Sequence, residues 1–318
     1  MNGSCPTISF IVVNRNTADL LIACLEHIYA SDLDETPQVI VVDNGSTDDS
    51  VARVAAAFPQ ATVIEANRNL GFARANNMAF ARADGELLML VNTDAMLEKS
   101  CARVLCSLMR SRPEVGMVGP QLLNRDGSRQ TSYEAVPDIA TETLNRSLLK
   151  RLLPSKYPGK HRPLSGPEHV EALIGAVMMI RRQAVEQVGG FDEDYFFFLE
   201  ETDLAVRMRA AGWAVMHEPR ARSVHLQGAT ARSNESAARI EFYRSRYHFF
   251  RKHYGNRSAS VLKAILTANL ALNVVGLGLG SLVTFGQSQS LVRRFRVRRD
   301  LLRWHLAGCP QGPGLPRD

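Results

Sequence analysis

Several signatures of common enzyme classes are absent from this 318-residue chain. It has no Walker-type lysine loop, no Gly-x-Gly-x-x-Gly dinucleotide loop and no Gly-x-Ser-x-Gly elbow, which argues against NTPases, dehydrogenases and hydrolases. Its five cysteines are scattered and lack His or Cys partners at zinc spacing, so we expect reduced thiols in a cytosolic protein. The first six residues lack the basic and apolar regions of a signal peptide, which predicts a catalytic body in the cytosol.

Charge is distributed unevenly along the chain. Residues 1–250 carry 27 Lys and Arg against 30 Asp and Glu, a net of −3. Residues 251–318 carry 11 against 2, a net of +9. The body is therefore near neutral, and an acidic partner is predicted for the tail only.

Short apolar runs in the first half end in small polar residues. The runs 8–13, 39–42 and 87–91 end at Asn14, Asp43 and Asn92-Thr93-Asp94, and helical patterns lie between them. This alternation predicts an α/β fold with a mostly parallel sheet, in which ligands bind beyond the carboxyl ends of the strands. Asp94 has the carboxylate that a divalent cation bound to nucleotide phosphates requires, although an Asx-turn is the better explanation when this stretch is considered alone.

The second half begins with a polar, proline-rich segment, 124–168, which we interpret as a flexible lid or acceptor-facing loop. Farther along, an aromatic run leads into Glu200, Glu201 and Asp203 at the start of a predicted helix. The helix dipole favours acids in a first turn, which explains one or two of them. Carboxylates beside an aromatic wall have raised pKa values, as a general base needs, so we predict a catalytic role for this cluster.

His225 follows a short predicted strand and has two interpretations. It is either a hydrogen-bonded core histidine or, with Asp94, a metal or diphosphate ligand. Asp43 likewise either forms a turn or hydrogen-bonds a base or ribose.

The order of these motifs resembles the family-two inverting glycosyltransferases, and especially their rhamnosyltransferase-like branch. The segments that carry the resemblance are Ile8–Asn16, Val41–Asp48, Asn69–Phe72, Val91–Asp94, Gly175–Arg181, Gly190–Glu193 and Glu200–Leu204. The chain departs from the usual pattern at four places. Asn92 replaces the first Asp of the metal motif, and Glu201 replaces the usual catalytic Asp. Arg15 stands where an aromatic residue is common, and Gln227-Gly228 replaces a more glycine-rich turn after the histidine.

The resemblance implies a GT-A fold, a nucleotide-sugar donor linked to dTDP or UDP, and Mg²⁺ or Mn²⁺. Donor binding is implied for Val13, Asn14, Asp43, Ser46, Asn69, Gly71, Asn76, Asn92 and Gly175. Asp94 would bind the metal, with His225 nearby. Glu201 would be the general base, and Glu200 and Asp203 would position the acceptor or the base.

The tail combines apolar and basic segments. Residues 264–285 are uncharged and long enough to cross a bilayer, but Asn269 and Asn273 weaken a spanning interpretation, and an interfacial or re-entrant hairpin remains open. Residues 293–303 carry six arginines among apolar residues, the pattern of a helix attracted to anionic lipid. We expect no nucleic-acid partner.

These observations predict a GT-A domain over 1–250, with a nucleotide-sugar half (1–123), the loop 124–168 and an acceptor half (169–250), followed by the tail 251–318. The expected function is sugar transfer, possibly of rhamnose, to a lipid-linked or polysaccharide acceptor at the cytoplasmic face of the plasma membrane. Two alternatives remain open at this point, a nucleotidyltransferase and an inactive nucleotide-sugar-binding scaffold.

Overall fold

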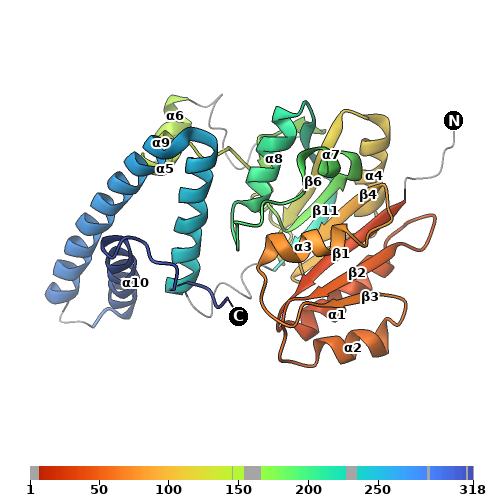
Figure 1. Ribbon diagram of the computed structural model, residues 1–318, viewed down its shortest axis with the longest axis horizontal. Coiled ribbons are helices and arrows are strands. Elements are labelled where there is room, and N and C mark those ends of the chain that lie inside the picture. The colour runs from red at the N-terminus through yellow and green to blue at the C-terminus, as the bar shows by residue number, and fades with distance from the viewer. Residues whose placement is uncertain are drawn as a thin grey trace.

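The protein consists of an α/β body and a C-terminal group of helices (Figure 1). The computed structural model describes residues 7–144, 146–153, 166–226, 235–284, 287–312 and 314–317. Figure 1 shows the sheet of the body, whose first strands are red and orange, at one end of the molecule and the long helix α9 at the other.

A nine-stranded, mostly parallel sheet forms the centre of the body. Its main path runs through β3 (Thr62–Glu65), β2 (Gln38–Asp43), β1 (Ile8–Asn14), β4 (Leu87–Val91), β10 (Val177–Arg181), β6 (Val115–Leu123), β11 (Ala214–His225) and β5 (Ala95–Leu97), and β8 (Glu168–His169) pairs with β11. The strands β1 to β4 are parallel, as predicted, whereas β10 is antiparallel to both β4 and β6. The carboxyl ends of β1, β2 and β4 therefore meet at one edge.

Helices cover both faces of this sheet. One face carries α1 (Ala18–Tyr29), α2 (Ser50–Ala57) and α4 (Cys101–Ser111), and the other carries α3 (Phe72–Phe80), α7 (Arg182–Val188) and α8 (Glu200–Ala210). Alternate residues of one strand pack on opposite faces of the sheet. In β1, Phe10 and Val12 belong to the core on the side of α1, α2 and α4, and Ile11 belongs to the core on the side of α3, α7 and α8. This explains why the strands are continuous apolar runs.

α2 begins only at Ser50, because the side chains of Asp43 and Asn16 accept hydrogen bonds from the Ser46 and Thr47 backbone N–H groups and hold a turn before the helix. β11 is a single long strand whose pairing with β6 shifts register twice. The expectation of reduced thiols holds for Cys24, Cys101 and Cys309 but is wrong for Cys106, which is disulfide-bonded.

The described part of segment 124–168 contains regular structure. β7 (Tyr133–Glu134) pairs with β9 (Ala172–Leu173), and α5 (Ile139–Thr143) begins with a capping box between Asp138 and Thr141. A further helix, α6 (Arg146–Leu152), follows. Residues 154–165 of the predicted loop lie outside the described residues.

The tail is a bent helix with a second helix packed against it. α9 (Glu235–Val283) has non-helical backbone at Gly255 (φ 84°, ψ 167°), which divides it into two limbs. In Figure 1 these limbs diverge from a common corner, and α10 (Gln289–Leu306) lies between them. The first limb packs Phe249 and Phe250 against Tyr195 and Leu199 of the body, so the predicted boundary at residue 250 lies within this limb.

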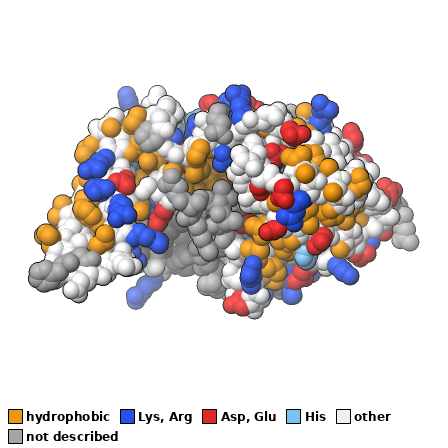
Figure 2. All heavy atoms as spheres, turned by 90° about the horizontal axis from the view of Figure 1, so that it is seen from below, with side chains coloured by type: hydrophobic (Ala, Val, Ile, Leu, Met, Phe, Trp, Pro, Cys, Tyr) orange, Lys and Arg blue, Asp and Glu red, His pale blue; other side chains and the backbone are white. Residues whose placement is uncertain are grey.

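The second limb exposes apolar side chains to solvent. Among the described residues, α9 is the one helix long and apolar enough to cross a membrane, and 11% of its most apolar window is buried. Exposed Leu272, Val275, Leu279, Leu282 and Val283 recur at helical spacing. In Figure 2, hydrophobic and basic side chains alternate over this end of the molecule.

Candidate active site

A cavity of about 330 Å³ opens where the carboxyl ends of β1, β2 and β4 meet. Six of the residues predicted to bind donor or metal contribute to its lining: Val13, Asn69, Gly71, Asn92, Asp94 and His225. We refer to this cavity as the donor pocket. Ligands of open α/β sheets bind at this position, beyond the carboxyl ends of the strands.

Asn14, Asp43 and Ser46 lie outside the lining and are hydrogen-bonded to one another. The Asn14 amide donates to Asp43 Oδ1 (3.2 Å) and to Ser46 Oγ (3.1 Å), and the Ser46 N–H donates to Asp43 Oδ2 (3.0 Å). Asn14 is fully buried and Asp43 nearly so. These side chains therefore fix the ends of β1 and β2 next to the pocket.

Sequence reasoning missed Asn44, which connects two loops of the pocket. Its amide nitrogen donates to Asn69 Oδ1 and to the Gly71 carbonyl (both 3.2 Å), and its Oδ1 accepts from the Leu70 N–H (2.8 Å). Gly71 has φ 82°, and a Cβ there would overlap the Phe196 backbone. The Asp-Asn-Gly-Ser sequence after the second strand could have indicated Asn44, but only Asp43 and Ser46 of this sequence were predicted to bind the donor.

The side chains of Asp94 and His225 face each other across the pocket wall. Asp94 Oδ1 lies 3.4 Å from His225 Nε2, and each side chain is 13% exposed. His225 Nδ1 lies 3.1 Å from Gln130 Oε1, while the Gln130 amide nitrogen donates to the Asn124 side chain and to the His225 carbonyl. Since Gln130 presents its oxygen to Nδ1, the neutral imidazole carries its proton there and has its lone pair at Nε2.

Two acceptor atoms, a carboxylate oxygen and an imidazole nitrogen, therefore face each other in the pocket. An oxygen–imidazole pair of this kind fits a divalent ion such as Mn²⁺. Asn92 is also in the lining, and its N–H donates to the Ala176 carbonyl (2.9 Å).

The aromatic run that leads into α8 has an unusual backbone. Phe198 (φ 75°) and Leu199 (φ 66°) are both in the left-handed region, which costs a non-glycine residue on the order of 1–2 kcal/mol. The run is held by the Ser245 hydroxyl, which donates to the Phe197 carbonyl (2.8 Å), and by edge-to-face packing of Phe198 on Phe242. Phe196, Phe197 and Phe198 line the donor pocket, so this bend places the first turn of α8 beside it.

Burial changes the acidity of the first two carboxylates in α8. Glu201 Oε2 is buried with no hydrogen-bond partner among the described residues, and Glu200 Oε2 has the same environment. Burial, reinforced by the negative charge of Glu134, raises the pKa of Glu201 to about 7. Burial and the charge of Glu201 raise the pKa of Glu200 well above its usual range.

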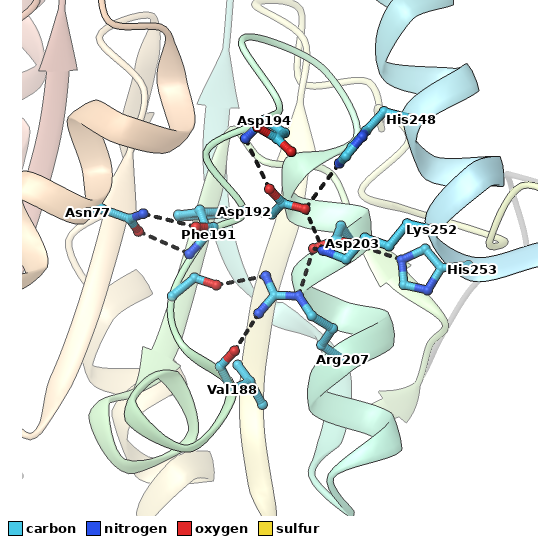
Figure 3. A network of polar contacts seen from close by, with 11 residues as sticks. Asn77, Val188, Phe191, Asp192, Asp194, Asp203, Arg207, His248, Lys252 and His253 are labelled. Atoms are coloured by element: carbon cyan, nitrogen blue, oxygen red, sulfur yellow. Dashed lines mark hydrogen bonds and ion pairs between the residues drawn. The ribbon is translucent and has the colours of Figure 1, made fainter. Parts of the chain in front are cut away.

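Asp203 faces away from the donor pocket, toward α9. It accepts from Arg207 Nε (2.7 Å), Lys252 Nζ and His253 Nε2 (2.7 Å), and it is fully buried (Figure 3). Burial would raise the pKa of Asp203, but hydrogen bonds from His253, Lys252 and Arg207 outweigh it and lower that pKa. This carboxylate is therefore ionised and fully partnered.

The same network holds the loop before α8. Arg207 donates to the Val188 and Gly190 carbonyls, both at 2.7 Å (Figure 3). Asp192, Asp194 and His248 have ligand atoms close together, but Lys252 Nζ already lies 2.5 Å from Asp192 Oδ2. We therefore assign this cluster to the ion-pair network.

Two further predicted residues, Asn76 and Gly175, are also outside the donor pocket. The Asn76 amide donates to the Phe72 carbonyl in its own helix (2.9 Å). Gly175 packs against Glu201, and a Cβ at Gly175 would lie 3.4 Å from the Glu201 carboxyl carbon. The C-terminal segment adds a contact that sequence reasoning missed: Asn69 donates to the Pro316 carbonyl (2.8 Å), and Leu315 and Pro316 line the pocket.

Comparisons with known proteins agree with this geometry. The family model described as Glycosyl transferase family 2 matches residues 9–189, and a model described as the N-terminal domain of galactosyltransferase matches residues 160–229. The chain is 26% identical over 260 residues to an N-acetylglucosaminyl-diphospho-decaprenol L-rhamnosyltransferase of Mycobacterium tuberculosis, covering 74% of this chain and 81% of that protein. It is 23% identical to the O-antigen chain rhamnosyltransferase WbaN of Salmonella anatum, covering 65% and 62%.

Solved structures share the fold. A mannosyltransferase from Pyrobaculum calidifontis, in complex with GDP-mannose and Mn²⁺, superposes with a TM-score of 0.58 at 20% identity, covering 96% of this chain and 87% of that one. The transferase GalNAc-T7 with UDP, GalNAc and Mn²⁺ gives 0.57 at 14% identity, covering 71% and 44%. The predicted GT-A fold is thereby confirmed. Because the family model covers more than half of the chain, this protein belongs to glycosyl transferase family 2 and is a glycosyltransferase.

Proposed function

We propose that this glycosyltransferase moves a hexose, with rhamnose as the first candidate, from a dTDP- or UDP-linked donor to a lipid-linked saccharide, with inversion at the anomeric carbon. The observation that carries the proposal is the buried, unpartnered Glu201 oxygen, with a pKa of about 7, beside the donor pocket. A general base works best when its pKa is near the operating pH. The names of two relatives, both rhamnosyltransferases, support the sugar.

In the proposed reaction, Glu201 takes the proton from the acceptor hydroxyl. The freed oxygen bonds to the anomeric carbon while the bond from that carbon to the diphosphate oxygen breaks, and its electron pair leaves with the diphosphate. Asp94 and His225 would hold Mg²⁺ or Mn²⁺, which when bound offsets charge on the diphosphate. The Mn²⁺ in both structural neighbours supports this assignment.

The remaining residues have supporting roles in this proposal. Val13, Asn69, Gly71 and Asn92 line the donor pocket, and the Asn14–Asp43–Ser46 group holds its edge. Asp203 acts as a positioning residue, because its ion pairs fix α8, which carries Glu201, against α9. Glu200 has a supporting role beside Glu201 in this proposal, and burial together with the charge of Glu201 raises its pKa.

The tail supports a site at a membrane surface. The exposed apolar face of α9 and the arginines of α10 together suit the boundary of an anionic bilayer. The decaprenol-linked substrate in the name of one relative is itself a membrane lipid. We propose peripheral binding to the cytoplasmic face of the plasma membrane.

The first test is donor binding to the purified protein across dTDP-, UDP- and GDP-sugars, with and without Mn²⁺. We expect one donor to bind in a metal-dependent way. The second test is Glu201→Gln, which should lower turnover about 10²- to 10⁴-fold while donor affinity stays unchanged. Unchanged turnover in this variant would contradict the assignment of Glu201 as the base.

A further inference from the structure

A second, larger cavity lies between the body and the tail. It has a volume of about 830 Å³ and is lined by residues of the loop after β3, by both limbs of α9 and by the segment after α10. Its lining is mainly polar, and it shares Asn69 and Phe196 with the donor pocket. We call it the interdomain cavity. Its size is within the range of ligand sites.

The acidic groups in this cavity are largely neutralised by neighbouring arginines. Glu241 is paired with Arg244 (2.9 Å) and Arg317 (2.5 Å), and Glu193 is paired with Arg74 (3.4 Å). Among the lining carboxylates that the structure describes, only Asp194 has no ion pair. The acids of the cavity therefore leave little negative charge to repel an anion.

Three basic side chains in the lining form no ion pair with a described carboxylate. Arg68 and Arg251 are exposed and make no ion pair with any described residue. Lys263 has one weak contact, 3.5 Å from its Nζ to the Gly308 carbonyl. Arg251 and Lys263 lie in the two limbs of α9, on either side of Gly255, while Arg68 belongs to the body. The bend in α9 thus brings unpaired positive charges from separate elements to one cavity.

The second limb of α9 also carries an exposed apolar face, beyond the cavity. This limb contributes Ser260 and Lys263 to the cavity lining, and the apolar face includes Leu272. Leu272 lies nine residues after Lys263, which is about 14 Å along the helix axis and about half a turn around it, so the two side chains point to opposite sides of the helix. Leu272, Val275, Leu279, Leu282 and Val283 then extend the apolar face to the end of the helix.

We propose that the interdomain cavity binds the diphosphate of a polyprenyl-diphosphate-linked acceptor, whose lipid chain passes around the second limb of α9 to its exposed apolar face. The inference rests on the proposed function and names its acceptor class. Guanidinium and ammonium groups are the usual partners of phosphate oxygens in proteins. The shared wall with the donor pocket at Asn69 and Phe196 lets the first sugar on the diphosphate reach the donor.

The test measures direct binding of farnesyl diphosphate to the full chain in neutral detergent micelles. The probe is compared across the wild type, an Arg251→Gln/Lys263→Gln double variant and an Arg257→Gln control. Arg257 is an exposed residue of the same helix outside the cavity lining, so the control removes a positive charge without changing the site. Farnesol and inorganic pyrophosphate serve as probes without the charge and without the lipid.

We expect the double variant to weaken farnesyl diphosphate binding about tenfold or more, with the Arg257→Gln control within twofold of the wild type. Farnesol should bind weakly and equally to all three proteins. Pyrophosphate should displace farnesyl diphosphate only at higher concentration; equal affinity for the two would overturn the lipid part of the proposal. Equal farnesyl diphosphate affinity in wild type and double variant would overturn the site itself.

Donor affinity separates this inference from the proposed function. Donor binding in the presence of Mn²⁺ should be the same in the double variant and the wild type. If it falls together with farnesyl diphosphate binding, the cations serve the donor, and the acceptor assignment is wrong. If no donor binds to the wild type, the proposed function fails, while the farnesyl diphosphate result still decides whether the cavity is a lipid-diphosphate site.

Discussion

Glu201→Gln should stabilise the protein at pH 8 while it removes activity. A pKa raised from 4.5 to about 7 means that the folded protein holds a proton there that the unfolded chain has released. At about 1.4 kcal/mol per pH unit, ionising this buried carboxyl lowers the free energy of unfolding by roughly 3 kcal/mol. Between about pH 4.5 and 7, stability falls as pH rises, and above pH 7 the loss is complete.

Glutamine has no charge to bury, but its amide group meets no acceptor at the position of Oε2, so we expect a net gain of about 1–3 kcal/mol at pH 8. The assay is urea unfolding at pH 4.5 and at pH 8, in which the gain should be present only at pH 8. Glu186→Gln on α7 is the matched control, since Glu186 is exposed and its side chain makes no hydrogen bond or ion pair with the described residues. A stability difference that is the same at both pH values would refute the reasoning.

Three other changes probe the site. The pH profile of kcat/KM should fall about tenfold per unit below pH 7, because Glu201 must be ionised to accept a proton, and a profile flat down to pH 5 would contradict this assignment. Gln130→Leu should weaken Mn²⁺ binding about 10- to 100-fold, as measured by Mn²⁺ titration, because His225 loses the partner that fixes its tautomer. Unchanged affinity would show that Gln130 does not orient His225 for metal binding. Asp203→Asn should lower the free energy of unfolding by about 3–5 kcal/mol, measured as a lower urea midpoint, because Arg207, Lys252 and His253 lose their buried carboxylate partner. An unchanged midpoint would show that the network contributes little to stability.

The order of strands and helices in the body follows from local sequence. The three strands predicted at 8–13, 39–42 and 87–91 all exist, and each ends in polar residues at the same edge of the sheet. The left-handed cap at Gly189 (φ 86°) ends α7 as the Gly-Gly pair predicts. These features were predictable from local sequence. A strand that is buried on both faces appears as a continuous apolar run, and a chain reversal appears as turn residues, all within about ten residues.

Contacts between distant segments left no comparable signal. Gln130 orients His225 from a position 95 residues earlier, within a segment that we expected to be a loop. Asn69 contacts Pro316, which is 247 residues away. The antiparallel placement of β10 between β4 and β6 likewise depends on the whole sheet. Such pairings are set by tertiary packing, so a single sequence predicts the candidates for a site but not their partners.

The three acids of α8 could have been assigned different roles from the sequence alone. Glu201 and Asp203 are two residues apart, which on an α-helix separates their side chains by about 200°. They therefore face opposite directions, and one binding site cannot use both directly. The structure gives each direction its own environment. Glu201 faces Gly175 and the charge of Glu134, which with burial raises its pKa, whereas Asp203 faces the cations of α8 and α9, which lower its pKa. The helical period alone thus separates the proposed base from the residue that positions it.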